Sequence, residues 1–319
     1  MPPFTTRSKA CISFAFRAPA LVLPVKPIKY GSTQTQAEVD MDRGASLLAD
    51  RGVIRIAGGE ATAFLHRLLT NSMLGMRQGE GRYAAILTPQ GKLLFDFFVI
   101  PLPEGAEAGY LLDCGKDQVA DLLKKLNLHK LRAKIAIEDQ SDRLAVAALW
   151  GDAAPRQFDG VAFADPRMPA LGFRVIAAPA SLAKFATAAQ EIYETRRIAL
   201  GVPKGGIDFA YGDAFVHDAD LDWLNGVDFQ KGCYPGQEVV ARVHFRNSPR
   251  KRILKVRFDG PPPLPGSEVM MGEISIGKVG STAGSEGLAM LRLDRLEDAK
   301  SAGIRLKAGE AGIEVTPPH

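Results

Sequence analysis

The residues with the clearest chemical potential form the stretch KGCYPGQE, residues 231–238, which places a cysteine beside a lysine and a glutamate. Pro235 suits the first turn of a helix that would run through PGQEVVARV. A helix N-terminus and a nearby Lys231 would both favour the thiolate of Cys233, which is the reactive form of a cysteine. Glu238, in the same short stretch, supplies a carboxylate. The pattern therefore predicts a tuned, functional thiol.

A second interpretation of the same stretch is structural. Apolar residues alternate with polar ones from Val239 to Phe245, and this pattern is typical of a strand rather than a helix. Cys233 would then be a small buried residue in a tight turn, a common place for a free cysteine. The local residues alone slightly favour this alternative.

The other cysteines narrow the kind of site that the chain can form. Cys11, Cys114 and Cys233 are odd in number and far apart, which argues for a reducing compartment and against a disulfide framework. Three thiols also fall short of the four ligands that a permanent iron–sulfur cluster normally takes. The five histidines show no zinc-site spacing.

Asp96 stands alone in the apolar run LLFDFFVI, residues 93–100. A carboxylate in such a strand is costly unless it is paired, hydrogen-bonded or turned toward a cavity. Asp96 is therefore a candidate ligand-binding residue or a base with a raised pKa. An outward-facing position on a half-exposed strand explains it equally well.

Two further groups of polar residues have both a functional and a structural explanation. Tyr193 and Arg197 lie near the end of an expected helix, where they would stack a flat heterocycle and pair with its carboxylate; the helix dipole alone also favours arginine there. Basic residues between 242 and 257, with no acid among them, would attract an anion or RNA. A solvated strand face is the more common explanation of such a run.

The elements around these residues indicate an α+β fold. A strand and helix are expected over residues 52–69, a hairpin over 82–100, and a strand followed by an amphipathic helix over 110–131. Strands follow at 133–139, 143–151 and 172–179, a loop-rich region at 151–170, and one long helix over 181–201. After the prolines of 261–265, short strands with glycine turns predict a small β-barrel.

Composition and charge exclude several classes of protein. The chain has 319 residues, 46% of them hydrophobic, enough for a full core, and no apolar run long enough to span a membrane. Five of the 40 basic residues and none of the 36 acidic ones precede Glu38, so the remainder carries 35 basic against 36 acidic residues. This remainder of the chain therefore lacks the excess of positive charge that is typical of nucleic-acid-binding proteins. The acid-free segment of residues 1–37 is expected to be either a transit-like sequence or a disordered extension.

The motifs, in this order, resemble the YgfZ family of folate-binding iron–sulfur assembly factors, which are related to the glycine-cleavage T-protein. The resemblance lies in DRGVIRIAGGEATAFLHRLLTN, LTPQGKLLFDFFV, DPRMPALGFRV, RRIALGVPKG and GVDFQKGCYPGQEVVAR, across residues 48–258. It implies a T-protein-like ring of subdomains, with folate in the central opening. We expect a tail at 1–42, interlocked folate-binding subdomains at 43–140 and 141–247, and the C-terminal β-barrel at 248–319.

The resemblance also assigns roles to individual residues. It implies Cys233 as the functional thiol, aided by Lys231 and Glu238, with no permanent metal but a possible transient cluster ligand at Cys233. It implies tetrahydrofolate or a derivative as cofactor. The residues that it assigns to folate binding are Asp96, Tyr193, Arg197, Tyr234, Gln237 and, with less support from relatives, Arg51.

The leading hypothesis is an accessory factor for assembly or repair of [4Fe–4S] proteins, including radical enzymes that modify tRNA. Its partners would be folate, iron–sulfur carrier proteins and client enzymes, without membrane or direct nucleic-acid binding. It would act in a bacterial cytoplasm, or in the mitochondrial matrix if residues 1–40 are a transit peptide. The alternative is a folate-dependent aminomethyltransferase, although LGFRVIAAP stands where T-proteins carry a GYTGE-like stretch.

Overall fold

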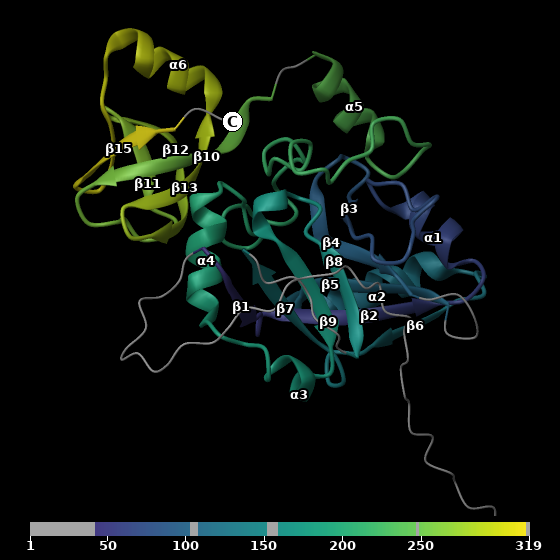
Figure 1. The fold of residues 1–319 in the computed structure, drawn as a ribbon. Helices are drawn as coiled ribbons and strands as arrows, with labels where there is room; N and C mark the ends of the chain where they lie inside the picture. The colour runs from purple at the N-terminus through teal and green to yellow at the C-terminus, as the bar shows by residue number, and fades with distance from the viewer. Residues whose placement is uncertain (1–41, 103–107, 152–158, 247–248, 317–319) are drawn as a thin grey trace, which may run out of the picture.

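Figure 1 presents a computed structural model of the chain, which describes residues 42–102, 108–151, 159–246 and 249–316. The expected tail at 1–42 lies outside the described residues except for Asp42. None of the helices in the described ranges combines the length and the hydropathy needed to cross a bilayer.

The first sheet has five antiparallel strands in the order β3-β4-β5-β2-β6. Its strands are β2 (Arg51–Ala57), β3 (Arg82–Leu87), β4 (Leu93–Pro101), β5 (Gly109–Gly115) and β6 (Ala136–Asp139). Because side chains alternate across a strand, one face packs on α1 (Ala61–Leu68) and α2 (Val119–Lys130), and the opposite face enters the central core. The predicted hairpin and both predicted helices of this region are confirmed.

The second sheet has four antiparallel strands in the order β1-β7-β9-β8. They are β1 (Gly44–Leu47), β7 (Ala145–Trp150), β8 (Gly160–Ala164) and β9 (Phe173–Ala177). The region predicted to be loop-rich, 151–170, also contains a strand that was not predicted, because GVAFA pairs along β9 as β8. Backbone pairing with a neighbouring strand outweighs the turn-forming residues that flank this short segment.

The long helix predicted for 181–201 is two separate helices, α3 (Pro179–Leu182) and α4 (Gln190–Ala199). The break is caused by tertiary hydrogen bonds to Ala45 of β1. The amides of Thr187 and Ala188 donate to the Ala45 carbonyl, and the Ala45 amide donates to the Thr187 hydroxyl. The segment therefore bonds to a strand from the start of the described chain, and the helix restarts only at Gln190. Its predicted end near Gly201, which has a φ of +74°, is confirmed.

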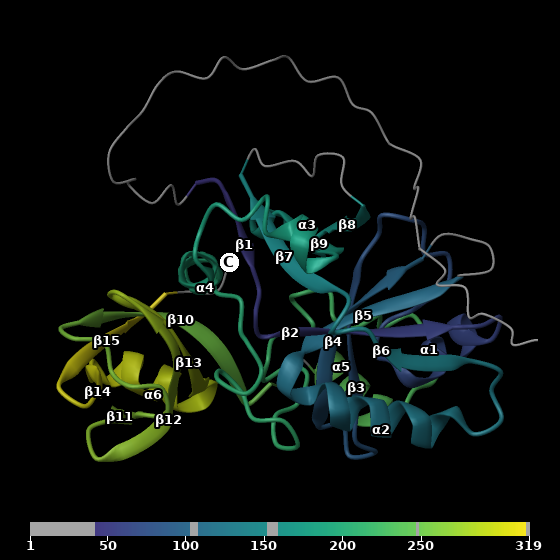
Figure 2. The ribbon, with the colours of Figure 1, turned by 90° about the horizontal axis from the view of Figure 1, so that it is seen from below.

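The C-terminal part is a closed antiparallel barrel in the order β10-β13-β12-β11-β14-β15, as predicted. Its elements are β10 (Lys251–Asp259), β11 (Glu268–Met271), β12 (Ile274–Ala283), β13 (Glu286–Arg292), α6 (Leu293–Ala302), β14 (Leu306–Ala308) and β15 (Ala311–Val315). Seen from below, the barrel lies to one side of the two sheets, and α4 runs between the barrel and β1 (Figure 2). Irregular chain from 201 to 236 and α5 (Gln237–Arg246) complete the fold.

Candidate functional site

The KGCYPGQE stretch forms a loop that is fastened to the first sheet's helical layer. The Lys231 ammonium donates to the carbonyls of His66, at 2.6 Å, and Leu69, at the C-terminal end of α1. Its Nζ lies 4.9 Å from the ring centroid of Tyr234, which is itself buried. Burial lowers the pKa of Lys231 to about 8. The Lys231 ammonium therefore anchors the loop to α1.

Cys233 is exposed in this loop, between the buried residues Lys231 and Tyr234. The structure resolves the helix-or-strand alternative in favour of a helix, but α5 begins only at Gln237. The predicted start of the helix near Pro235 is corrected to Gln237, so Cys233 precedes the first turn of α5 by several residues. A thiol that projects into solvent is accessible to a partner molecule.

Of the two glycines near Cys233, Gly236 is required by its backbone conformation and by a close contact. Its φ is +83°, and a Cβ there would lie 2.6 Å from the Thr88 carbonyl oxygen and 2.9 Å from the Cα of Gly91. Gly91, in the turn between β3 and β4, also has a φ of +83°. Two glycines thus let the start of α5 rest on the hairpin turn. Gly232, by contrast, has no heavy atom within 4 Å of such a Cβ.

The two polar residues at the start of α5 differ in their surroundings. The Gln237 side-chain amide donates to the Lys231 carbonyl at 3.5 Å, which closes the loop on itself. Glu238 is exposed in the first turn of α5, where a carboxylate complements the helix dipole. The structure thus brings Lys231, Cys233 and the first turn of α5 into one surface feature.

Asp96 occupies a separate, half-buried position on β4. Its two carboxylate oxygens accept hydrogen bonds from different tyrosines: the Tyr83 hydroxyl donates at 2.7 Å, and the Tyr211 hydroxyl donates to the other oxygen. Burial, followed by the Asp96 charge and its hydrogen bonds, raises the pKa of both phenols well above the usual value. Both hydroxyls therefore remain protonated donors, and Asp96 is not the outward-facing residue of the structural alternative.

Arg51 and Tyr193 belong to a buried network of charges beside Asp96. Arg51 and Arg174 both pair with Asp113, the latter at 2.6 Å, and Arg174 also contacts Asp165 at 3.0 Å. The Tyr193 hydroxyl accepts hydrogen bonds at 3.2 Å from Arg174 and from Arg167. Burial opposes the ionisation of Asp165, but the two arginines outweigh burial and lower its pKa to about 2.

The ring of Phe98 lies at the centre of this network. The guanidinium carbons of three arginines lie near its centroid: Arg174 at 4.1 Å, Arg167 at 4.9 Å and Arg51 at 5.8 Å. The Tyr83 ring lies 5.3 Å from the same ring and connects it to Asp96. The structure therefore places Arg51, Asp96 and Tyr193 around one interior cluster.

Arg197 lies elsewhere, at the contact between α4 and the barrel. Its guanidinium pairs with Asp208 at 3.1 Å and with Glu194 at 3.0 Å, and donates to the Ser281 hydroxyl of β12 at 2.8 Å. The Ser281 amide donates to the other oxygen of Asp208 at 2.6 Å. Arg197 therefore joins the body of the protein to the barrel rather than lying beside Asp96.

Sequence reasoning missed most members of the interior network. Asp113 in YLLDCG carries the same signal that identified Asp96, a lone carboxylate within an apolar strand. Arg174 likewise interrupts the apolar strand β9. The two arginines that pair with Asp113 are 61 and 62 residues away in the chain, so that pairing had no local signal.

The T-protein-like fold implies tetrahydrofolate as a ligand, and of the residues assigned to it Asp96 has suitable surroundings. Asp96 is half-buried, and its carboxylate retains acceptor capacity beyond the two tyrosine bonds, as the N–H groups of a pterin require. Tyr193 is only 2% exposed and is covered by arginines, so it does not present a stacking face as it stands. Folate contacts of Tyr193, Arg197, Tyr234 and Gln237 stay predictions. Among the described residues, no group of three or more His, Cys, Asp or Glu side chains is arranged to hold a metal ion.

Comparison with known protein families agrees with this architecture. The GCVT N-terminal domain family matches residues 26–178, and the CAF17 C-terminal beta-barrel family matches residues 250–319. In the solved structures, aminomethyltransferase T of the glycine cleavage system from Bartonella henselae superposes with a TM-score of 0.70, covering 87% of this chain and 86% of that one. At 16% identity, this likeness establishes the fold alone, and the predicted T-protein-like fold is confirmed.

Similarity over most of the chain connects it to a narrower group. The mitochondrial iron–sulfur cluster assembly factor IBA57 homolog of Coccidioides immitis is 32% identical, over 82% of this chain and 74% of that protein. Mitochondrial IBA57 of Mus musculus is also 32% identical, over 78% of each chain. The expected resemblance to YgfZ proteins is thus met at the level of a related family, and YgfZ membership itself stays a prediction. The chain belongs to the IBA57 family of iron–sulfur cluster assembly factors.

Proposed function

We propose that this chain is an accessory factor for the assembly or repair of [4Fe–4S] proteins, acting through the exposed thiol of Cys233. The names of its relatives support the iron–sulfur role. A structural observation supports the role of the thiol: Cys233 is exposed on a loop that is held by Lys231 on one side and by buried Tyr234 on the other. The cluster is cargo in this proposal, and the chain does not keep it.

The arrangement of the loop suits a transient role for the thiol. Lys231 and Gly236 fix the two ends of the loop against α1 and the β3–β4 turn, so the position of Cys233 is defined although its side chain is exposed. In its thiolate form Cys233 is either a temporary ligand of a passing cluster or a nucleophile. Partners in this proposal are iron–sulfur carrier proteins and client enzymes, including those that modify tRNA.

Tetrahydrofolate binding is the second part of the proposal, and Asp96 would hold it. When bound, folate supplies a one-carbon-carrying heterocycle, and this chain's contribution is the acceptor carboxylate and the two tyrosine donors around it. Asp96→Asn is expected to weaken tetrahydrofolate binding at least about tenfold in a fluorescence titration, because a charged hydrogen-bond acceptor is lost. Asp121→Asn, on the exposed face of α2, is the control. Equal affinities in the two variants would remove Asp96 from the site.

Restoration of activity in cells is the test of the assembly role. Cells depleted of their own factor should regain the activity of [4Fe–4S] enzymes when the full chain is expressed in the compartment of the clients. An enzyme without a cluster serves as the control and should not change. Normal levels of folded protein without restored [4Fe–4S] activity would contradict the role. The relatives' names favour the mitochondrial matrix over a bacterial cytoplasm as that compartment.

A folate-dependent aminomethyltransferase is the second candidate, and the Asp96 site within a T-protein-like fold is what favours it. Its test is direct. Purified chain is incubated with 5,10-methylene-tetrahydrofolate and amine donors, and turnover is followed. Turnover abolished by Asp96→Asn but not by Cys233→Ser would favour the transferase over the assembly factor.

A further inference from the structure

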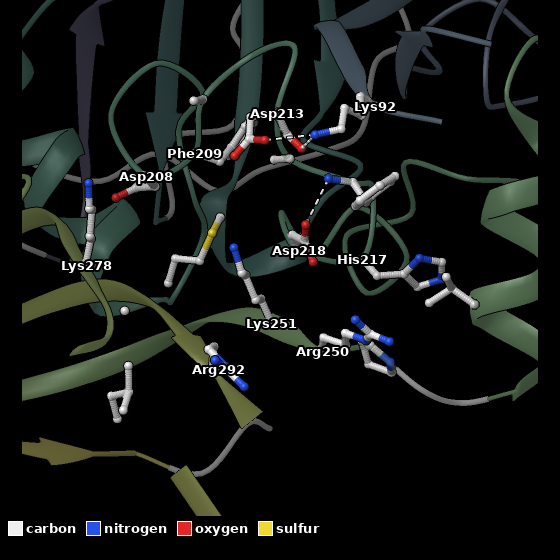
Figure 3. A pocket seen from close by; sticks show the side chains of 18 of the residues that line it. Lys92, Asp208, Phe209, Asp213, His217, Asp218, Arg250, Lys251, Lys278 and Arg292 are labelled. Atoms are coloured by element: carbon white, nitrogen blue, oxygen red, sulfur yellow. Dashed lines mark hydrogen bonds and ion pairs between the residues drawn. The ribbon is translucent and has the colours of Figure 1, made fainter. Parts of the chain in front are cut away.

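A cavity of about 1050 Å³ lies between the body and the barrel, away from both Cys233 and the Asp96 carboxylate. It is lined by the 206–218 segment, by the outer face of α5 and by strands β12 and β13 (Figure 3). Its volume is at the upper end of the range of about 300–1,000 Å³ that small-molecule sites occupy. Tyr211 of the same segment points to Asp96, whereas Phe209 and Asp213 face the cavity.

The charges around this cavity are unbalanced. Its acids are already engaged: Asp213 pairs with Lys92 at 2.8 Å, Asp208 with Arg197, and Asp218 accepts from the Phe215 amide at 3.0 Å. Five cations of the lining have no hydrogen-bond or ion-pair partner among the described residues. They are Arg242, Arg246, Arg250, Lys251 and Lys278.

These cations come from different elements and surround one space. Arg242 and Arg246 lie on α5, Lys251 on β10 and Lys278 on β12. In Figure 3, Lys251 and Lys278 approach the cavity from different walls. Since the chain from Glu38 onward carries one more acid than base, this local excess of positive charge does not follow from the overall charge. A cleft lined by one sign of charge concentrates counter-ions of the opposite sign.

A buried histidine, His217, closes one part of the cavity wall. His217 is 3% exposed and lines the cavity, yet neither of its ring nitrogens has a partner among the described residues. Burial lowers the pKa of His217, so at neutral pH the ring is neutral and carries one donor and one acceptor. The ring packs against Phe229 and His244, at 6.4 Å between ring centroids in each case, and both nitrogens are enclosed, so His217 shapes the wall without offering a hydrogen bond to the cavity.

Apolar side chains form the rest of the wall. Phe209, Phe215, Val239 and Val243 lie between the cations, and Lys92 is 5.2 Å from the ring centroid of Phe215. The barrel strands that contribute to the wall belong to a closed barrel, so they present no free edge to an extended peptide. The combination favours a compact ligand with an apolar body and several acidic groups over a protein segment.

We propose that this cavity binds a small organic anion that has an aromatic body and at least two phosphate or carboxylate groups. The arginines would hold the acidic groups, because guanidinium pairs with either group in a bidentate manner. The aromatic body would lie against the apolar wall. This inference does not depend on the assembly role.

Binding to the full chain is measured by calorimetry at low salt with EDTA, using four probes. ATP and benzene-1,2,4-tricarboxylate carry an aromatic body with phosphates or carboxylates; tripolyphosphate lacks the body, and adenosine lacks the charge. We expect at least one of the first two to bind, tripolyphosphate to bind at least about tenfold more weakly, and adenosine not to bind. Which of the first two binds distinguishes a phosphate from a carboxylate ligand.

Substitutions in the cavity wall test whether the probes bind in this cavity. Arg242→Gln and Lys278→Gln, both exposed and on different walls, are each expected to weaken the affinity about tenfold, as is typical when one charge-assisted contact is lost. Lys184→Gln removes the same charge away from the cavity and should have no effect. No binding of either aromatic anion, equal binding of tripolyphosphate, or an equal loss in Lys184→Gln would overturn the proposal.

Discussion

At the scale of single residues, the two cysteines of the described ranges have opposite surroundings. Cys114 is fully buried in β5, and burial raises the pKa of its thiol to about 12. Its Sγ donates to the Gly52 carbonyl at 3.8 Å. Cys233 is exposed on its loop. Because the thiolate is the reactive species and access is required, reactivity should be confined to Cys233.

Buried charges are the second feature at this scale. The carboxylate of Asp165 is ionised inside the core because Arg167 and Arg174 surround it. Removing one partner of such a buried group typically costs about 3–5 kcal/mol, since the remaining charges lose their compensation. The network therefore holds β9 and α4 in place through Tyr193 as well as through apolar packing.

Asp165→Asn should lower the free energy of unfolding by about 3–5 kcal/mol at pH 7. The wild-type contribution is present above the usual pKa of 3.8 and is lost as the pH falls through the folded value of about 2. The difference between wild type and variant should therefore narrow between pH 4 and pH 2, as measured by urea unfolding at each pH. The exposed Asp121→Asn is the control, and a difference that is constant with pH would refute the ionised state of Asp165.

Residue-level sequence reasoning succeeded where a residue contradicts its local pattern. Asp96 was identified because a carboxylate interrupts LLFDFFVI, and the structure gives it two tyrosine partners. It did not reveal partners that lie elsewhere in the chain, such as Arg167 and Arg174, which both donate to the Tyr193 hydroxyl. Such pairings depend on tertiary packing, which no local pattern encodes.

At the scale of elements, the position of Cys233 depends on how α5 meets the β3–β4 hairpin. Gly91 and Gly236 both have positive φ, and their backbones approach closely where α5 begins. The sequence predicts the hairpin that contains Gly91, but not that its turn contacts Gly236. The same limit explains the broken helix at 183–189, where hydrogen bonds to Ala45 of β1 override a continuous helical pattern.

Gly236→Ala is therefore expected to disturb the loop. A Cβ would lie 2.6 Å from the Thr88 oxygen, and the φ of +83° is unfavourable for alanine by roughly 1–2 kcal/mol before any clash is counted. Gly232→Ala, with open space around its Cβ, is the matched control. We expect a lower thermal midpoint and reduced support of [4Fe–4S] enzymes only for Gly236→Ala. Equal behaviour of both variants would show that the close approach does not position Cys233.

At the scale of the whole molecule, the barrel is joined to the body by polar contacts around α4. Arg197 contacts Asp208 and Ser281, and the Lys255 ammonium of β10 donates to the Ala199 carbonyl at 2.9 Å. The barrel was predicted from its short strands and glycine turns. The contact between the barrel and the body was not predicted. The resemblance assigned Arg197 to folate binding, whereas its side chain pairs with Asp208 and donates to Ser281 of β12.

Arg197→Met should uncouple the barrel from the body. Asp208 would lose its buried partner, at a cost of about 3–5 kcal/mol, while each part keeps its own core. We expect calorimetric unfolding to separate into two transitions and limited proteolysis to release the barrel from the body. Arg77→Met, which removes an exposed surface pair, should leave one transition. A single transition in Arg197→Met at unchanged temperature would show that apolar contacts alone join the two parts.

The most direct measurement compares the two thiols in the same cells. Cells depleted of their own factor receive wild type, Cys233→Ser or Cys114→Ala at equal expression, and the activity of a [4Fe–4S] enzyme is determined. We expect Cys233→Ser to fall to the level of the depleted cells, and Cys114→Ala to retain activity in proportion to its folded fraction. Full activity of Cys233→Ser would contradict a functional role for the exposed thiol.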